Sequence, residues 1–387
     1  MEYRKHQGWA ISEIGIGCYA LSGAYGTKDP QEFARMLGRA HELGVNFFDT
    51  ADAYGDAEGV LGKAIKPFRH EVYVATKVGV QENASFDLSP AYVKAACEQS
   101  LQRLQTDYVD LYQVHFDDPT TPVAETVGAL EELASAGKIR RYGVGHLPPE
   151  RVKTYLTTSR VFSVLTELSA VARAACKELL PLCQAHGVGV IGFSVAGRGI
   201  LTGKIKQRPA FEASDIRNVD PLFQRERFQS AVRVAEKLGE LGRRHAKTPV
   251  QAAIAWVLSQ PGVVCALTGP STIPHLEENL GGSGWTLSPQ DLGDLDVFFE
   301  QEDAWLMKKD RASVERILSE PLPPDPSQAF TDLVYVFETA ILLSLTTEEQ
   351  VMPTFMRLYG MRDSLDENVA PKLKEIQRQL GELIEVG

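Results

Sequence analysis

Four polar residues lie at or just after the ends of strand-like segments, and their side chains could carry acid–base chemistry. Asp49 ends VNFFD, Lys77 ends VYVATK, His115 ends YVDLYQVH, and Tyr54 follows in the loop DTADAYG. A free tyrosine has a pKa of about 10, too high for efficient proton donation at pH 7. We expect the Lys77 ammonium to lower the pKa of Tyr54. Asp49 would keep that lysine charged, and His115 would donate to a substrate oxygen.

The surrounding segments alternate between short apolar runs and helix-length amphipathic runs. This alternation predicts a parallel sheet, and eight units suit a closed (β/α)8 TIM barrel, whose active site lies at the carboxyl ends of the strands. The expected strands are 45–49, 72–77, 108–115, 139–145, 163–168, 189–193 and 263–268, with 13–17 as a weaker eighth. The expected helices are 30–43, 89–104, 122–136, 149–158, 176–186, 226–246, 250–260, 273–280 and 287–302.

The pattern changes near the carboxyl end of the chain. PLPPDP at 321–326 predicts a stiff joint, and 327–346, 347–360 and 366–384 are expected to be helical. We therefore expect a barrel domain over 1–320 and a helical extension over 321–387. The segment 329–345 is apolar on more than one face, so it must pack on the barrel, on the other tail helices or on a second subunit. We expect it to cover the barrel or to form an interface with another copy or a partner protein.

Composition and charge exclude several classes of protein. The 387 residues carry a net charge of −11, which disfavours general binding to nucleic acid or to an anionic membrane. Five cysteines without metal-ligand spacing predict free thiols in a reducing compartment and no metal site. No secretory signal and no uninterrupted apolar run of membrane-spanning length is evident. We expect a cytoplasmic protein.

Two glycine-rich stretches resemble nucleotide-binding motifs but lack their context. GIGCYA at 15–20 matches G-x-G-x-x-A, yet LSGAYGTKDP follows, where a Rossmann motif requires a helix. GRGILTGK at 197–204 resembles the end of a P-loop, yet its glycine spacing is wrong and Ile205 stands where Ser or Thr is needed. Neither stretch predicts a Rossmann fold or a P-loop ATPase.

The segment GVNFFDTADAYGDAEGVLG at 44–62 resembles the signature of the aldo-keto reductase family. The segments 111–145 and HLEENL at 275–280 are also similar to that family, so the resemblance covers roughly residues 10–285. It implies a (β/α)8 barrel with a reduced nicotinamide cofactor across its carboxyl face. It further implies that Tyr54 is the general acid, that Lys77 tunes it, that Asp49 pairs with Lys77 and that His115 orients the carbonyl.

The resemblance also implies cofactor contacts, some of them altered here. Gly17, Cys18 and Asp49 would contact the cofactor, and in FSVAGRG Phe193 would stack on the nicotinamide while Ser194, Gly197 and Gly199 hold the pyrophosphate. The family's V-S-N reads Val144-Gly145-His146, and Leu165 replaces the usual Gln. His146 would either take over the role of the Asn or face solvent.

At the adenine end, the resemblance assigns contacts to Ser271, Thr272, His275, Glu278 and Asn279. The cation that many relatives carry at the positions of Gly269 or His275 for the 2′-phosphate is missing. NADP remains the expected cofactor, with NAD as the alternative.

Three hypotheses for the function follow. The first is an NAD(P)H-dependent carbonyl reductase; Tyr19, Leu21, Phe86 and Phe116 would line the mouth of the barrel and favour an apolar or aromatic carbonyl substrate. The second is a catalytically weak nucleotide-sensing subunit that binds a partner protein through its carboxyl-terminal helices. The third hypothesis, a barrel lyase or isomerase without nicotinamide, is the weakest. It leaves the HLEENL segment, which resembles an adenine-binding site, without a role.

Overall fold

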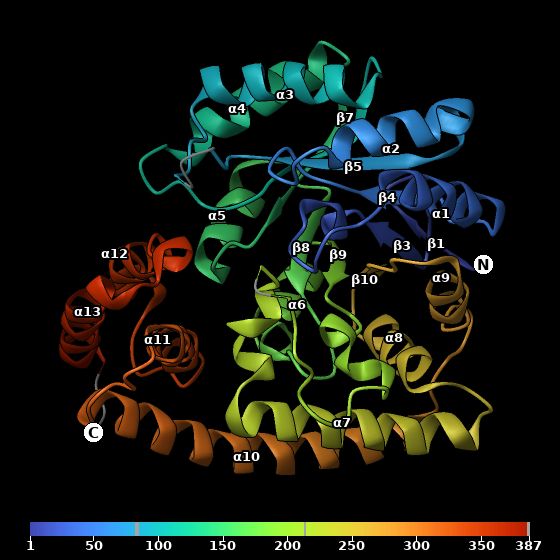
Figure 1. The fold of residues 1–387 in the computed structure, drawn as a ribbon. Coiled ribbons are helices and arrows are strands. Elements are labelled where there is room, and N and C mark those ends of the chain that lie inside the picture. The colour runs from blue at the N-terminus through green and yellow to red at the C-terminus, as the bar shows by residue number, and fades with distance from the viewer. Residues whose placement is uncertain (82–84, 213, 385–387) are drawn as a thin grey trace. The chain divides into compact units, whose positions relative to one another are not determined.

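The computed structural model describes residues 1–81, 85–212 and 214–384 (Figure 1). Contacts between residues divide the chain into two units. The barrel unit comprises Met1–Gly203 and Leu238–Ser288, and the helical unit comprises Lys204–Lys237 and Pro289–Gly387. The helix α7 (Arg225–Arg244) therefore contributes to both.

Eight parallel strands close the barrel in the order β10-β3-β4-β5-β6-β7-β8-β9, which confirms the predicted fold class. The closing pair joins β3 to β10, with Ile14 opposite Ala266. All eight predicted strands are present, with ends that differ by at most two residues. Their bounds are β3 Ile14–Gly17, β4 Phe47–Asp49, β5 Tyr73–Val78, β6 Val109–Val114, β7 Ile139–Gly145, β8 Ser163–Glu167, β9 Gly189–Phe193 and β10 Val263–Thr268.

Helices surround the strands and begin where the sequence supplies caps. The Asp29 carboxylate accepts the Gln31 N–H at the start of α1, and Thr248 forms a capping box with Gln251 at the start of α8. Pro30 and Pro249 occupy the first helical positions, where no backbone N–H is needed. The helices are α1 Pro30–Glu42, α2 Ala57–Ile65, α3 Pro90–Leu104, α4 Val123–Ser135, α5 Pro149–Thr158, α6 Leu179–Ala185, α8 Pro249–Ser259 and α9 Ile273–Leu280. Of these, α2 was not predicted.

An amino-terminal hairpin, which the sequence analysis missed, packs against the apolar interior of the barrel. Its strands β1 (Tyr3–His6) and β2 (Trp9–Ser12) turn at Gln7 and Gly8, both with positive φ. The Trp9 ring stacks on Tyr73 at 4.4 Å and lies 4.5 Å from Phe162. These contacts join the hairpin to the core built by Phe47, Ala75, Leu111, Phe162, Leu165, Ile191, Cys265 and Leu267.

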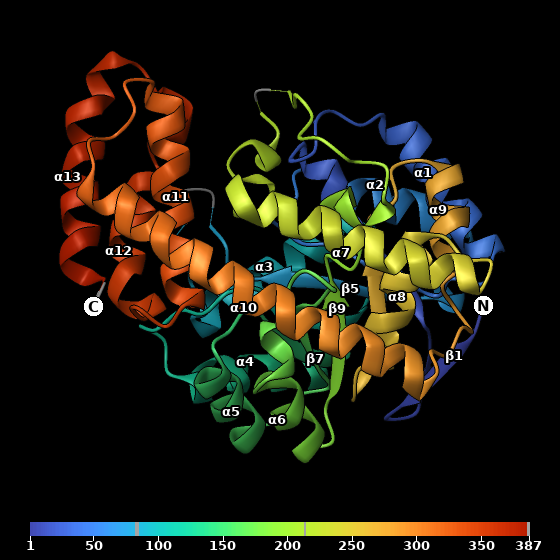
Figure 2. The ribbon, with the colours of Figure 1, turned by 90° about the horizontal axis from the view of Figure 1, so that it is seen from below.

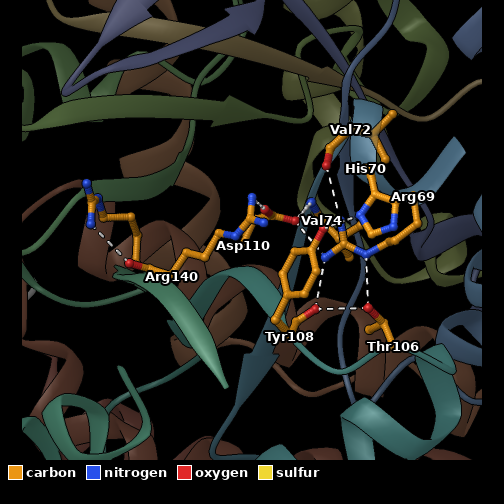
Figure 3. Close-up of polar contacts among 9 residues, drawn as sticks. Arg69, His70, Val72, Val74, Thr106, Tyr108, Asp110 and Arg140 are labelled. Atoms are coloured by element: carbon orange, nitrogen blue, oxygen red, sulfur yellow. Dashed lines mark hydrogen bonds and ion pairs between the residues drawn. The ribbon is translucent and has the colours of Figure 1, made fainter. Parts of the chain in front are cut away.

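A charged cluster is buried near the amino ends of β5, β6 and β7 (Figure 3). Asp110, fully buried, accepts from Arg69 at 2.7 Å, from Arg140 at 2.9 Å and from the Val74 N–H at 3.0 Å. The two guanidinium carbons lie 4.1 and 4.0 Å from the centroid of the Tyr108 ring. This cluster ties three consecutive strands together at the end opposite the predicted site.

The helical unit has an apolar core of its own. Figure 2 shows α11 beside α12 and α13, and the three pack with the end of α10. The unit's elements are the first part of α7 with α10 Pro289–Ser319, α11 Pro326–Leu342, α12 Glu348–Tyr359 and α13 Ala370–Leu383. On α11, Phe330, Leu333 and Val336 are fully buried in this core. The apolar segment thus packs on other helices of its own unit.

The helix α10 extends 17 residues past the predicted end at 302, and it groups with the later helices. It runs antiparallel to the first part of α7, because Arg227 pairs with Asp310 while Arg233 pairs with Glu302. The predicted domain boundary between residues 320 and 321 stays a prediction, and the contacts group the chain differently. Across the described residues, no helix combines the length and apolar character that crossing a membrane requires.

Candidate active site

The carboxyl ends of β4, β5 and β6 bring three polar side chains together inside the barrel. Lys77 Nζ donates to Asp49 Oδ1 at 2.5 Å and to the Thr50 carbonyl at 2.7 Å. Gln113 Nε2 donates to Asp49 Oδ2 at 3.2 Å. All three side chains belong to residues that are at most 4% exposed, so the Lys77–Asp49 ion pair is held away from water. Asp49 and Lys77 were predicted from the sequence, whereas Gln113 was not.

Tyr54 lies beside this group, in the loop after β4. Its ring centroid is 5.0 Å from Lys77 Nζ, 4.9 Å from the Tyr19 ring and 5.7 Å from the His115 ring. Burial, and then the Asp49 carboxylate, raise the pKa of Tyr54 well above its ordinary value. The expected lowering of this pKa by Lys77 is therefore not found, and the ammonium is already paired with Asp49. The phenol stays protonated at neutral pH.

His115 is a buried, neutral imidazole. Burial, together with the positive charge of Lys77, holds its pKa well below the ordinary histidine value. Its Nδ1 is buried and has no hydrogen-bond partner among the described residues. A neutral ring carries one N–H, so His115 can donate a hydrogen bond but is not an imidazolium acid.

His146 stands next to His115 in a strained conformation. Its φ is 51°, a left-handed value uncommon for a residue with a side chain. Its Nδ1 lies 3.1 Å from the His115 carbonyl, which can only accept, so Nδ1 carries the proton. Burial lowers the pKa of His146 to about 4. The ring lies 4.6 Å from Phe116 and 4.8 Å from Phe193, inside the site rather than in solvent.

Gly145 and Leu165, the two residues that differ from the family pattern, fit together sterically. The two residues are opposite each other on β7 and β8, and a Cβ added at Gly145 would lie 3.3 Å from Leu165 Cβ. Leu165 is buried in the barrel core. The two positions therefore present no side-chain polar group where the resemblance implies Ser and Gln.

A pair of acidic residues beside the site, Asp52 and Glu58, was also not predicted from the sequence. Glu58, fully buried on α2, accepts from Thr76 Oγ1 at 2.5 Å and from Arg103 Nε at 2.6 Å. Asp52 lies between Asp49 and Tyr54 in the sequence, and its Oδ1 is buried without a partner among the described residues. Burial and the Glu58 charge raise the pKa of Asp52 to about 7. Both causes depend on how the chain folds around Asp52, so sequence spacing does not reveal the raised pKa.

The loop after β9 turns sharply through residues with positive φ, a backbone that a ligand could approach closely. Ser194, Gly197, Arg198 and Gly199 all have positive φ, from 51° to 96°. A Cβ on Gly197 would lie 3.0 Å from Leu201 and Val171, so this position requires glycine. Phe193 is the last residue of β9, and its half-buried ring contacts the ring of His146.

The remaining predicted cofactor residues lie in two places. Cys18 is fully buried, which raises the pKa of its thiol, and its N–H donates to the Asp49 carbonyl at 2.8 Å, so its side chain is not open to a ligand. Gly17 precedes it at the end of β3. On α9, Thr272 caps the helix by accepting the His275 N–H. The other members of this group are Ser271 just before the helix, and Glu278 and Asn279 in its last turn.

Three of the four predicted substrate residues belong to a chain of aromatic contacts around Tyr54 and His115. Tyr19 touches Tyr54 edge-on, while Phe86 stacks on Phe116 at 5.4 Å. Phe116 in turn contacts His115 at 4.8 Å. Leu21 is half-buried in the turn after Tyr19. Within the described ranges, no group of three or more His, Cys, Asp or Glu residues could hold a metal ion.

Comparisons with known proteins agree with this geometry. The model of the Aldo/keto reductase family matches residues 13–299. "Aldo-keto reductase YhdN" of Bacillus subtilis is 34% identical over 311 residues, covering 78% of this chain and 94% of that protein. "Probable aldo-keto reductase 1" of Glycine max is 34% identical over 299 residues, covering 75% and 86%.

Two solved structures are also similar. The glycerol dehydrogenase AKR11B4 of Gluconobacter oxydans has a TM-score of 0.72 at 27% identity, covering 78% of this chain and 96% of that one. An aldo/keto reductase of Klebsiella pneumoniae in complex with NADP and acetate has a TM-score of 0.62 at 28% identity, covering 77% and 95%. The matches leave the carboxyl-terminal helices outside the family region.

Proposed function

Since this chain belongs to the aldo/keto reductase family of oxidoreductases, we propose that it reduces aldehydes or ketones to alcohols with NADPH, using Tyr54 as the general acid. One observation carries the proposal. The protonated Tyr54 phenol lies between a neutral His115 and the buried Lys77–Asp49 ion pair, at the carboxyl face where barrel active sites lie.

The residues present fit a dinucleotide in most places. Phe193 offers a ring face, the glycines at 197 and 199 let a ligand approach the backbone of the loop after β9, and the start of α9 offers a helix amino end for a phosphate. His146 Nε2 is an acceptor, because Nδ1 holds the proton, and could bind an amide NH₂. No cation stands at Gly269 or His275, so a preference for NADPH over NADH would be modest. The NADP-bound Klebsiella neighbour supports NADP(H).

The chemistry divides between the cofactor and the protein. The reduced nicotinamide, when bound, supplies a hydride to the carbonyl carbon. Tyr54 gives its phenolic proton to the oxygen that becomes the alcohol, and His115 donates a hydrogen bond to that same oxygen. The Lys77 ammonium stabilises the phenolate that remains, while Asp49 and the Thr50 carbonyl keep the ammonium in place. The aromatic side chains around Tyr54 favour an apolar or aromatic substrate.

The test is NADPH oxidation with a panel of aliphatic and aromatic aldehydes and ketones, with the alcohol product quantified. We expect alcohol formed in a one-to-one ratio with NADPH consumed, and higher kcat/KM for aromatic members. Binding of the dinucleotide without turnover of any member would contradict the proposal.

That outcome would favour the second candidate, a nucleotide-sensing subunit. Gly145 and Leu165 favour it, because they remove two polar side chains from the cofactor site. A partner protein or a second copy bound through the carboxyl-terminal helices, and a cytoplasmic location, stay predictions.

A further inference from the structure

We propose that Gln113 is a positioning residue for the reaction: its amide fixes the second oxygen of Asp49, so that the carboxylate holds Lys77 in one arrangement beside Tyr54. The proposal rests on the proposed function. Gln113 is fully buried on β6, and its Nε2 donates to Asp49 Oδ2 at 3.2 Å. Lys77 donates to the other oxygen, Oδ1.

The orientation of the amide follows from its partner. An ionised carboxylate only accepts hydrogen bonds, so the NH₂ group of Gln113 must face Asp49. Its Oε1 is consequently left buried, with no partner among the described residues. Such an acceptor costs stability, and an apolar side chain of similar size would avoid that cost. Core packing alone therefore does not favour glutamine here, whereas the bond to Asp49 does.

The two neighbouring strands fix the position of Gln113 in the barrel wall. Gln113 is paired with Lys77 on one side and with Gly143 on the other. A Cβ at Gly143 would lie 3.4 Å from Gln113 Cγ and 2.7 Å from the Ser163 carbonyl. The Ser163 carbonyl therefore requires glycine at this position, whereas the distance to Gln113 is an ordinary van der Waals contact.

The consequence reaches Tyr54 through Lys77. An ammonium has three protons, and Lys77 gives one to Asp49 Oδ1 and one to the Thr50 carbonyl. If Oδ2 lost its amide, the carboxylate would be free to rotate and take a second lysine proton. The ammonium would then turn away from Tyr54, whose ring centroid is now 5.0 Å from Nζ. Catalytic groups lose much of their rate advantage when displaced by about 1 Å.

The experiment compares Gln113→Met with Leu111→Met. Both changes lie on the same strand and face, and both keep the side-chain volume nearly constant, but Leu111 is in the apolar core and does not bond Asp49. Three quantities are measured for each full-length variant: kcat and KM for a carbonyl substrate, the dinucleotide Kd by fluorescence titration, and the urea midpoint of unfolding.

For Gln113→Met we expect kcat to fall roughly 10-fold to 100-fold, with Kd changed less than about 2-fold. Leu111→Met should keep kcat within about 2-fold. Wild-type kcat in Gln113→Met would overturn the inference. A fall in kcat of equal size in Leu111→Met would overturn it too, because it would mark a general effect of the core.

A thermodynamic cycle tests the contact between Gln113 and Asp49, on which the inference depends, without turnover. The loss of urea midpoint caused by Gln113→Met should shrink to half or less when Asp49→Asn is already present, because the charge-assisted bond is then gone. The loss of urea midpoint caused by Leu111→Met should be the same with and without Asp49→Asn. An equal loss for Gln113→Met with and without Asp49→Asn would overturn the inference. If the wild-type chain binds dinucleotide but turns over no carbonyl, the proposed function fails, and this cycle still tests the contact between Gln113 and Asp49.

Discussion

Two buried aspartates lie at opposite ends of the barrel, Asp49 on β4 and Asp110 on β6, and their partners differ. Asp110, near the amino ends, accepts from two guanidinium groups and one backbone N–H. Asp49, at the carboxyl ends, accepts from one ammonium and one amide. Both carboxylates are deeply buried, so each depends on its partners to offset the loss of water.

The surroundings of the two carboxylates show what each end of the barrel is built for. Around Asp49, four polar atoms are buried without a partner among the described residues: Thr50 Oγ1, Asp52 Oδ1, Gln113 Oε1 and His115 Nδ1. Around Asp110, by contrast, no buried side-chain atom of Arg69, Asp110 or Arg140 lacks a partner among the described residues. The Asp110 cluster is satisfied and serves stability, while the surroundings of Asp49 retain unpaired groups that a ligand could engage.

The largest expected effect concerns activity at the carboxyl end. Tyr54→Phe should lower kcat for carbonyl reduction by about 10²–10⁴-fold, because the proton donor is lost while the ring contacts remain. The urea midpoint and the dinucleotide Kd should stay close to wild type. Steady-state kinetics measure kcat, and fluorescence titration measures the dinucleotide Kd. Wild-type kcat in this variant would refute the assignment of Tyr54 as the general acid.

The next effect concerns stability at the amino end. Asp110→Asn should lower the free energy of unfolding by roughly 3–5 kcal/mol, because two guanidinium groups then lose their shared anion. Equilibrium urea unfolding measures the loss. The kcat of the folded variant should remain within about 2-fold of wild type. A loss of kcat without a loss of stability would show that the two ends do not divide the roles in this way.

Asp52→Asn should instead stabilise the protein, and only above acidic pH. The pKa of Asp52 is raised to about 7, so between its ordinary value of 3.8 and 7 the folded chain keeps a proton that the unfolded chain has released. Wild-type stability therefore falls as pH rises through this window. The asparagine, which mimics the protonated acid, should add roughly 1–3 kcal/mol at pH 8 and nothing below pH 4. Urea unfolding at both pH values gives the difference, and a pH-independent gain would contradict the reasoning.

The smallest effect is expected for Arg140→Gln. The Arg140 side chain is 50% exposed, whereas Arg69 is 9% exposed. Solvent screens the Arg140–Asp110 ion pair, so its removal should lower the free energy of unfolding in urea by less than about 1 kcal/mol. A cost near that of Asp110→Asn would mean that the outer guanidinium matters as much as the buried one.

Much of the barrel could be predicted from sequence, because buried parallel strands and proline-started helices leave local signals. Asp49 ends β4, Lys77 is next to last in β5 and His115 directly follows β6, so the fold brings their side chains to one face. Tyr54 was identified through its place in the signature segment.

The missed features depend on contacts between distant segments. Gln113 looks like an ordinary strand residue until its amide is found on Asp49, 64 residues away. The pKa of Asp52 depends on burial and on the Glu58 charge. The expected lowering of the Tyr54 pKa was wrong because burial and the Asp49 charge both raise it. The hairpin at Trp9 was missed because its short strands lie outside the repeating βα pattern.

The pairing of β3 with β10 has a consequence for synthesis of the chain. The two strands lie about 250 residues apart, so β3 is made early and its second hydrogen-bonding edge has no partner until β10 has left the ribosome. At about 5–20 residues per second, that interval lasts on the order of 10–50 s. During this time β3 presents an open strand edge, which is the kind of surface on which nascent chains aggregate. The short length of β3, four residues with two glycines, limits what such an edge can recruit.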